Sequence, residues 1–139
     1  MGIEKRVVGN YVLEELLGQG EFGKVYKAYH KITNKIYAIK TFSVKRIDSN
    51  PKLKSLMNCE VTIMKQINHP NIIHLFEFLK SADNYYLVLQ YCDQGDLENY
   101  MSERNITKFP EDKAIVLFQQ ILNGFSELRK NKILHRDFK

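Results

Sequence analysis

Cysteines and long apolar runs are both scarce in this 139-residue sequence, and each shortage argues against a class of protein. The two cysteines, Cys59 and Cys92, lie far apart and outside any metal-ligand spacing, so we expect neither a disulfide framework nor a zinc site. This cysteine content suits a reducing cytosol. No apolar run approaches the roughly 20 residues that span a bilayer, and no signal peptide opens the sequence. We therefore expect a cytoplasmic protein with no membrane partner.

Dense runs of one charge are missing as well. The formal net charge of +5 comes from 21 basic and 16 acidic residues spread along the chain, with no basic run denser than Lys45-Arg46 and Arg129-Lys130. Scattered charge is typical of a solvated surface, and we favour that interpretation over nucleic-acid binding. Hydrophobic residues make up 44% and charged residues 27% of the sequence, which indicates a folded domain and not a disordered chain.

Three closely spaced glycines, Gly18, Gly20 and Gly23, mark the most informative segment. Glycine lets the backbone approach a ligand closely, so that main-chain N–H groups can bind an anion such as a phosphate. Glycines at this spacing occur in dinucleotide-binding βαβ units, where the loop leads into a helix, and in loops that join two antiparallel strands. The residues that follow the glycines distinguish these two alternatives.

Those following residues have the period of a β-strand. Residues 24–29 carry β-branched and aromatic side chains with a two-residue period, and residues 30–35 have the composition of a turn. Residues 36–40, Ile-Tyr-Ala-Ile-Lys, then form a return strand. We therefore expect the glycines at the tip of a β-hairpin and disfavour the dinucleotide-binding alternative.

This hairpin resembles a signature of the eukaryotic protein kinases. GQGEFGKV, residues 18–25, is similar to their Gly-rich loop, and YAIK, residues 37–40, to the strand that carries their lysine. The resemblance implies an α+β protein-kinase-like fold that binds ATP and Mg²⁺ and transfers the γ-phosphate to a protein hydroxyl. A whole kinase is about twice as long as this chain. The resemblance therefore implies a five-stranded antiparallel N-lobe sheet with one helix, followed by the first helices of an incomplete helical C-lobe.

Residues 51–67 have the period of an amphipathic helix, and Pro51 suits its first turn. Apolar side chains occupy one stripe and its flanks: Leu53, Leu56, Met57, Val61, Met64 and Ile67. Glu60 lies within that stripe, where a buried unpaired charge would cost about 3–5 kcal/mol. Periodicity alone leaves open whether Glu60 forms an ion pair with Lys40 or lies at the solvated edge of the stripe.

The kinase resemblance favours the ion pair, because the family pairs its strand lysine with a helix glutamate. It implies that Lys40 holds the α- and β-phosphates of ATP, and that Glu60 orients Lys40 from within hydrogen-bond reach. It also implies that Val25 and Ala38 sandwich the adenine.

Two further apolar runs, residues 73–79 and 85–91, flank a polar turn and predict a second hairpin. His69 precedes Pro70; a catalytic or metal-binding role is open to it, but we favour a turn residue that hydrogen-bonds the backbone. By resemblance, Leu89 lies at the back of the adenine pocket, and the backbone groups of Gln90 and Cys92 bind the purine edge. The full set of nucleotide-binding residues implied by the resemblance is Leu17, Gly18, Gly20, Gly23, Val25, Ala38, Lys40, Leu89, Gln90 and Cys92.

Two helices are predicted after the second hairpin. Asp96 can cap a short helix over 97–103, and Pro110 lies in the first turn of a long amphipathic helix over 110–128. Apolar residues of that long helix occupy more than a narrow stripe. We therefore expect self-association through the exposed 110–128 helix.

The sequence ends in His135-Arg136-Asp137-Phe138-Lys139, which resembles the kinase catalytic loop with Phe138 where leucine is commoner. The resemblance implies that Asp137 accepts the proton of the substrate hydroxyl, and Lys139, two residues later, is typical of Ser/Thr-directed kinases. The catalytic asparagine and the Asp-Phe-Gly motif that hold the metal ions do not occur in the sequence. We therefore expect no metal ligands and no phosphotransfer from these 139 residues alone.

The expected organisation is a lead-in over 1–10, a kinase N-lobe and hinge over 11–92, and the start of a C-lobe over 93–139. ATP and a protein substrate are the expected partners, and no nucleic acid is. Two alternatives stay open: a non-catalytic nucleotide-binding or scaffold module, and a different kind of ATP-using enzyme.

Overall fold

The computed structural model describes residues 6–20 and 23–134, which divide into two compact units. The first unit holds the described residues up to 67 together with 74–91, and the second holds 68–73 and 92–134. The chain thus leaves the first unit at residue 68, returns to it at residue 74 and leaves it again at residue 92.

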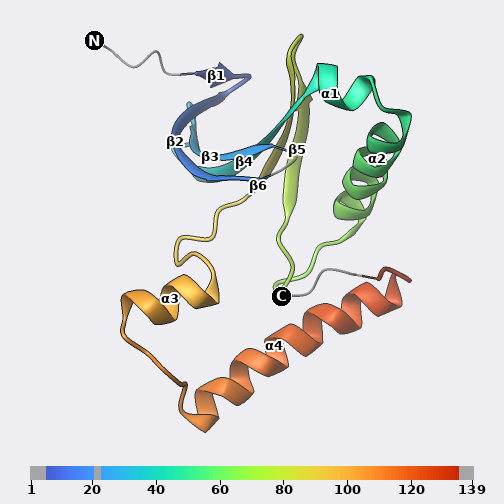
Figure 1. Cartoon of the computed structure of the whole chain (residues 1–139). Helices are drawn as coiled ribbons and strands as arrows, with labels where there is room; N and C mark the ends of the chain where they lie inside the picture. The colour runs from blue at the N-terminus through green and yellow to red at the C-terminus, as the bar shows by residue number, and fades with distance from the viewer. Residues whose placement is uncertain (1–5, 21–22, 135–139) are drawn as a thin grey trace. The chain divides into compact units, whose positions relative to one another are not determined.

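An antiparallel sheet forms the first unit (Figure 1). Among the described residues it has six strands in the order β1-β2-β3-β4-β6-β5. The strands are β1 (Val7–Val8), β2 (Tyr11–Gln19), β3 (Lys24–His30), β4 (Ile36–Ser43), β5 (Leu75–Lys80) and β6 (Asn84–Gln90). The predicted five strands are confirmed, and β1 is an addition within the expected lead-in. Gly9 makes β1 possible, because its φ of 55° turns the chain back so that Val7 pairs with Val12.

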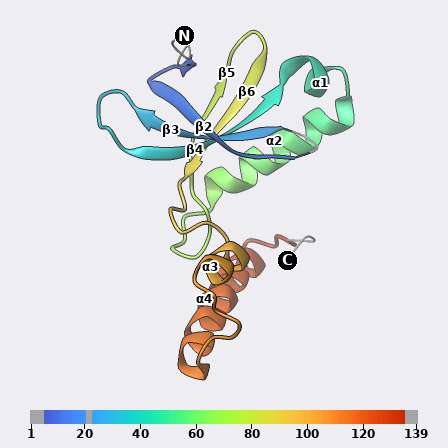
Figure 2. The ribbon, with the colours of Figure 1, turned by 60° about the vertical axis from the view of Figure 1, so that its left-hand side comes forward.

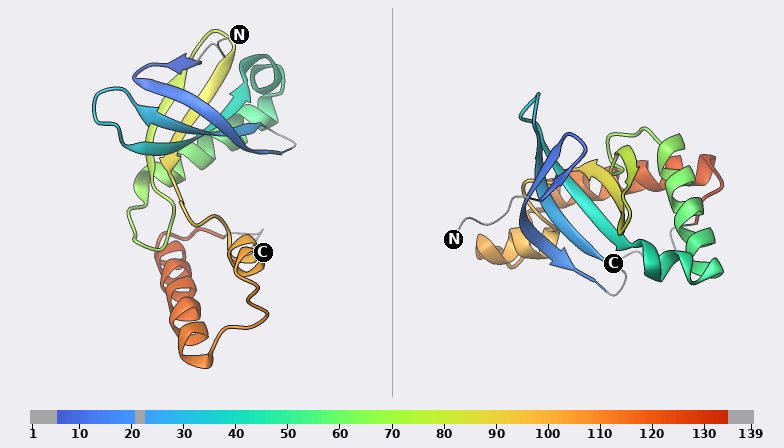
Figure 3. Two further views of the ribbon diagram at one scale, coloured as in Figure 1. Left: turned by 90° about the vertical axis from the view of Figure 1, so that its left-hand side faces the viewer. Right: turned by 90° about the horizontal axis from the view of Figure 1, so that it is seen from above.

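The sheet is strongly curved, as Figure 3 shows. The curvature brings together β2 and β5, which are not neighbours in the sheet: the Tyr11 hydroxyl donates a hydrogen bond to Glu77 Oε1 at 3.0 Å. Buried apolar side chains fill this curved face, namely Val8, Tyr11, Leu13, Ala28, Ile39, Tyr86 and Val88. The first hydrophobic core therefore lies within the curl of the sheet.

Two helices cover the other face of the sheet (Figure 2). They are α1 (Val44–Asp48) and α2 (Pro51–Gln66). The predicted helix is α2, and the Asn50 side chain caps it by accepting hydrogen bonds from the backbone N–H groups of Lys52 and Leu53. The second core contains Phe42, Ile47, Met57, Val61, Leu75, Tyr85 and Leu87. No helix was predicted at the position of α1. Leu56, which was predicted on a flank of the apolar stripe, is exposed.

The second unit contains α3 (Leu97–Glu103) and α4 (Glu111–Lys130), which confirm the two predicted helices. Asp96 caps α3 by accepting a hydrogen bond from the Asn99 N–H at 2.7 Å. The buried Gly124 of α4 lies against residues 71–72, where an added Cβ would stand 3.2 Å from the Asn71 carbonyl oxygen. The absence of a side chain at Gly124 therefore allows close packing inside this unit.

The loop at 68–73 confirms the predicted role of His69. Its Nδ1 accepts a hydrogen bond from the Asn71 backbone N–H at 3.1 Å, so the imidazole stabilises the turn. At the other end of the second unit, Ile133 and Leu134 form neither a helix nor a strand. The four large apolar side chains of α4 that are exposed to solvent are Ile115, Val116, Phe118 and Leu122.

Candidate nucleotide-binding site

A row of paired residues crosses four neighbouring strands of the sheet. Gly18 of β2 pairs with Val25 of β3, Val25 pairs with Lys40 of β4, and Lys40 pairs with Leu87 of β6. Directly paired residues of antiparallel strands project from the same face of a sheet. Leu87 belongs to the core beneath α1 and α2, so this whole row lies on the helix-covered face.

A second row lies one pleat further along the same face. Ala38 pairs with Leu89, and Ala38 follows the face of Lys40 because side chains alternate along a strand. Leu89 packs against the same core as Leu87. The predicted adenine-contacting residues Val25, Ala38 and Leu89 are therefore brought together on one face with Lys40.

The three glycines of the loop have different surroundings. A Cβ on Gly23 would overlap the backbone carbonyl of Thr41, so the fold itself requires glycine there. Gly18 and Gly20 have open space where a Cβ would stand, with no described atom within 4 Å. The Gly20 N–H donates to the Gly23 carbonyl at 2.9 Å and closes the loop. Packing against β4 thus explains why residue 23 is glycine. It does not explain Gly18 and Gly20, where the open space would let a ligand approach the backbone closely.

Leu17, the remaining predicted residue of this segment, lies beside Gly18 where the register of β2 shifts between Leu16 and Gly18. Its side chain is 41% exposed. An exposed apolar side chain beside the Gly-rich loop is accessible to a ligand.

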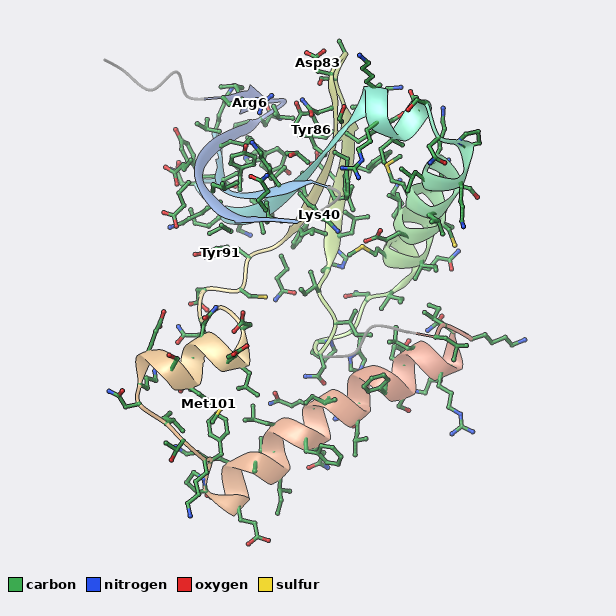
Figure 4. All side chains as sticks on the ribbon, viewed as in Figure 1. Arg6, Lys40, Asp83, Tyr86, Tyr91 and Met101 are labelled. Atoms are coloured by element: carbon green, nitrogen blue, oxygen red, sulfur yellow. The ribbon has the colours of Figure 1, made fainter. Side chains whose placement is uncertain are left out.

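Lys40 and Glu60 lie together in the structure, as predicted. Lys40 Nζ is 3.9 Å from Glu60 Oε1, which makes an ion pair but is longer than the predicted hydrogen bond. The side chain of Glu60 is 50% exposed and that of Lys40 35% exposed, so Glu60 lies at the edge of the apolar stripe and not inside it. Lys40 Nζ also stands 5.0 Å from the centre of the Phe42 ring. Figure 4 shows Lys40 on its strand beside α2.

Some backbone groups at and just after the end of β6 already form hydrogen bonds within the protein. The Gln90 N–H donates to the His74 carbonyl at 2.9 Å. The Gln90 carbonyl is therefore the backbone group of this residue that could accept a hydrogen bond from a purine. The Cys92 N–H donates to no backbone carbonyl among the residues that the structure describes. Each of the two residues therefore offers one backbone group, an acceptor at Gln90 and a donor at Cys92.

Two predicted catalytic residues, Asp137 and Lys139, lie outside the described residues. Within residues 6–20 and 23–134, no three His, Cys, Asp or Glu side chains come together in a way that could hold a metal ion. None of the helices in that part of the chain combines the length and apolar character that crossing a bilayer requires.

A polar cluster around Asp48 was not predicted from the sequence. Asp48, at the end of α1, receives a hydrogen bond from Tyr85 and faces two lysines. Its residues are spread over two helices and two strands, and no local pattern in the sequence links them.

Comparison with known proteins shows which family the chain belongs to. The family model of the protein kinase domain matches residues 11–139. The chain belongs to the protein kinase domain family, and its curved sheet with α2 and the helices that follow is the α+β fold of that family.

Curated relatives extend the comparison. The chain is 40% identical over 134 residues to the serine/threonine-protein kinase ATG1c of Arabidopsis thaliana, a match that covers 96% of this chain and 18% of that protein. It is 37% identical over 136 residues to the serine/threonine-protein kinase atg1 of Dictyostelium discoideum, covering 95% of this chain and 20% of the relative. It is 34% identical over 133 residues to the probable serine/threonine-protein kinase MARK-A of Dictyostelium discoideum, covering 95% and 12%. The chain thus spans about a fifth of the length of the first two relatives.

Proposed function

We propose that this chain is the ATP-binding part of a protein kinase that phosphorylates serine and threonine side chains. The observation that carries the proposal is the row that joins Gly18, Val25 and Lys40 on one sheet face, with Glu60 of α2 beside Lys40. The names of the curated relatives support the Ser/Thr class.

Phosphate binding is assigned to the glycine loop and Lys40. Gly18 and Gly20 leave room for phosphate oxygens to approach backbone N–H groups, and Gly23 holds the loop against β4. Lys40 supplies a positive charge on the same face and interacts with the α- and β-phosphates. Glu60 keeps the ammonium group oriented, because its carboxylate is the only acidic group in ion-pair contact with Lys40 among the described residues.

Adenine binding is assigned to apolar side chains and to the end of β6. Val25 and Ala38 lie on the face of Lys40, and Leu89 pairs with Ala38 on that same face. The Gln90 carbonyl would accept from the exocyclic amine of adenine, and the Cys92 N–H would donate to a ring nitrogen. A half-buried apolar surface with a few polar groups is typical of a small-molecule site.

Proton transfer is assigned to Asp137, with Lys139 beside it, on the basis of the kinase resemblance. Mg²⁺, when bound to ATP, neutralises charge on the phosphates. The residues that the structure describes contain no acidic cluster suited to hold it, so we assign no metal ligand within residues 6–20 and 23–134. We infer that these 139 residues bind ATP but need further residues for phosphotransfer.

The test uses the natural protein that contains this chain, incubated with γ-labelled ATP and a generic Ser/Thr-containing basic protein. We expect labelled substrate from the wild type, loss of label with Asp137→Asn, and strong loss with Lys40→Met. The matched control is Lys35→Met, because Lys35 is exposed in the β3–β4 turn. ATP binding without any transfer by the wild type would contradict the kinase assignment and favour a non-catalytic nucleotide-binding module.

A further inference from the structure

A carboxylate outside the nucleotide site is contacted by three groups at once. Asp48 Oδ1 accepts a hydrogen bond from the Tyr85 hydroxyl at 2.9 Å and lies 3.1 Å from Lys54 Nζ. Its other oxygen, Oδ2, lies 3.7 Å from Lys80 Nζ. Asp48 is therefore held from two sides by charge and by a hydrogen bond.

These contacts connect four elements of the first unit. Asp48 is the last residue of α1, and Lys54 lies in the first turn of α2. Lys80 ends β5 and Tyr85 is near the start of β6, so both belong to the hairpin beside the helices. The Tyr85 side chain is buried and stacks on Phe78, with ring centres 5.7 Å apart. The hydroxyl that holds Asp48 thus comes from a rigidly packed ring.

Directional contacts between α2 and the rest of the first unit are few. Among the described residues, α2 makes ion pairs at only two places, through Lys54 with Asp48 and through Glu60 with Lys40. The side chains by which α2 packs against the second core are apolar, namely Leu53, Met57, Val61 and Met64. Apolar contact is non-directional, so it constrains the exact position of the helix along the sheet less sharply than a short ion pair does.

The two ion pairs of α2 are joined by one continuous helix. Lys54 and Glu60 are separated by six residues, or about 9 Å of one continuous helix. The Lys40–Glu60 distance of 3.9 Å is already at the limit of an ion pair, so a small shift of α2 would separate the two groups.

We propose that Asp48 is a positioning residue, which holds the start of α2 against the β5–β6 hairpin so that Glu60 reaches Lys40. This inference rests on the proposed function, because the consequence of placing Glu60 is the orientation of Lys40 toward the phosphates. Asp48 itself contacts neither of those residues.

The charges of Asp48 and Lys80 agree with this positioning role. The hydrogen bond from Tyr85 and then the contact with Lys54 lower the pKa of Asp48 below its ordinary value. The pKa of Lys80 is raised, first by Tyr85. Asp48 is therefore ionised and Lys80 protonated at neutral pH, which maintains both ion pairs.

The experiment measures the affinities of the full chain for ATP with Mg²⁺ and for adenosine by titration calorimetry, in the wild type and in Asp48→Asn. Adenosine lacks phosphates, so its affinity reports the adenine contacts alone. We expect the ATP affinity to fall about three- to tenfold and the adenosine affinity to change less than about twofold. A change that merely loosened the fold would weaken both ligands together.

The matched control is Asp83→Asn. Asp83 lies at the tip of the same hairpin (Figure 4), and its side chain makes no ion pair or hydrogen bond with the described residues. We expect wild-type affinities for both ligands. The milder variant Tyr85→Phe keeps the stacked ring and removes only the hydroxyl, and we expect it to weaken ATP binding in the same direction.

A double variant that combines Asp48→Asn with Glu60→Gln tests whether Asp48 acts through Glu60. If Asp48 acts through Glu60, the double variant Asp48→Asn, Glu60→Gln loses no more ATP affinity than Glu60→Gln alone. An unchanged ATP-to-adenosine affinity ratio in both Asp48→Asn and Tyr85→Phe would overturn the positioning role, while leaving the nucleotide site intact. A wild type that binds ATP no better than adenosine would instead overturn the phosphate-binding function on which the inference rests.

Discussion

A side chain at position 23 would overlap the backbone carbonyl of Thr41 on the neighbouring strand. Thr41 is itself buried, and its hydroxyl donates to the Lys24 carbonyl at 3.2 Å, so the strand cannot easily move aside. Gly23 is therefore a requirement of packing, in contrast to Gly18 and Gly20, whose surroundings are open.

The contrast between these glycines predicts that the same substitution lowers stability at one position and has little effect at the other. Gly23→Ala should destabilise the fold by about 1–3 kcal/mol, because overpacking forces the backbone to shift. Gly18→Ala should change the free energy of unfolding by less than about 0.5 kcal/mol. Urea unfolding followed by circular dichroism measures both. Equal stabilities of the two variants would show that the loop does not pack against β4 as described.

The Asp48 cluster predicts a specific sensitivity to acid. The folded-state pKa of Asp48 is depressed, chiefly by the Tyr85 hydrogen bond, so its contribution to stability is present above the unfolded-state pKa of about 3.9 and is lost as the pH falls through the folded value. We expect wild type to be more stable than Asp48→Asn near neutral pH and the two unfolding curves to converge in acid. Asp83→Asn should instead follow wild type. A gap between wild type and Asp48→Asn that stays constant between about pH 6 and pH 2 would contradict this account.

Tyr11 predicts a complementary sensitivity to alkali. Burial first, and then the hydrogen bond to Glu77, raise the pKa of Tyr11 above its ordinary value. The stability that depends on the neutral phenol is present below an unfolded-state pKa of about 10 and is lost as the pH rises above it. Tyr11→Phe should lower the free energy of unfolding by about 0.5–1.5 kcal/mol at neutral pH, because it removes the hydrogen bond to Glu77. Its stability should then decline less than that of wild type toward high pH.

Glu77→Gln is the control for the Tyr11 prediction. Glutamine keeps an acceptor for the hydroxyl, and burial of Tyr11 is unchanged, so most of the alkaline loss should persist. Thermal unfolding between about pH 7 and pH 11 compares the three proteins. If Tyr11→Phe declined as steeply as wild type, another group would be responsible for the alkaline loss.

The exposed face of α4 predicts self-association of the 139-residue chain. Phe118 is 61% exposed and Leu122 50%, in one patch with Ile115. Contiguous apolar patches on soluble proteins tend to be covered by a partner. We expect concentration-dependent association by light scattering and binding of a hydrophobic dye, both reduced by Phe118→Glu. The control Gln119→Glu adds the same charge at an exposed polar position and should leave association unchanged. A monomer without dye binding would contradict the prediction.

Local signals explain which elements could be predicted from the sequence. The start of α3 follows from the Asp96 cap, and α2 and α4 follow from their apolar period and from Pro51 and Pro110. Polar turns between apolar runs located the strands of both hairpins. Each of these signals lies within a few residues of the element that it defines.

The features that were missed depend on contacts between distant residues. β1 exists because Gly9 turns the chain so that Val7 and Val8 can pair with β2, and α1 is held by the buried Ile47. The half-exposed position of Glu60 depends on how α2 lies on the sheet, which periodicity does not specify. Lys40 and Glu60 were connected by the kinase resemblance, whereas nothing comparable pointed to Asp48.

Titration of the 139-residue chain with ATP and Mg²⁺, in parallel with adenosine, tests the proposed nucleotide site most directly. Wild type should bind ATP more tightly than adenosine, and Lys40→Met should abolish that difference while adenosine affinity stays within about twofold. Lys35→Met, which removes an exposed charge from the β3–β4 turn, should bind both ligands as wild type does. Equal affinity of wild type for ATP and adenosine, or a preference for ATP that survives Lys40→Met, would contradict the assignment of this sheet face as a phosphate-binding site.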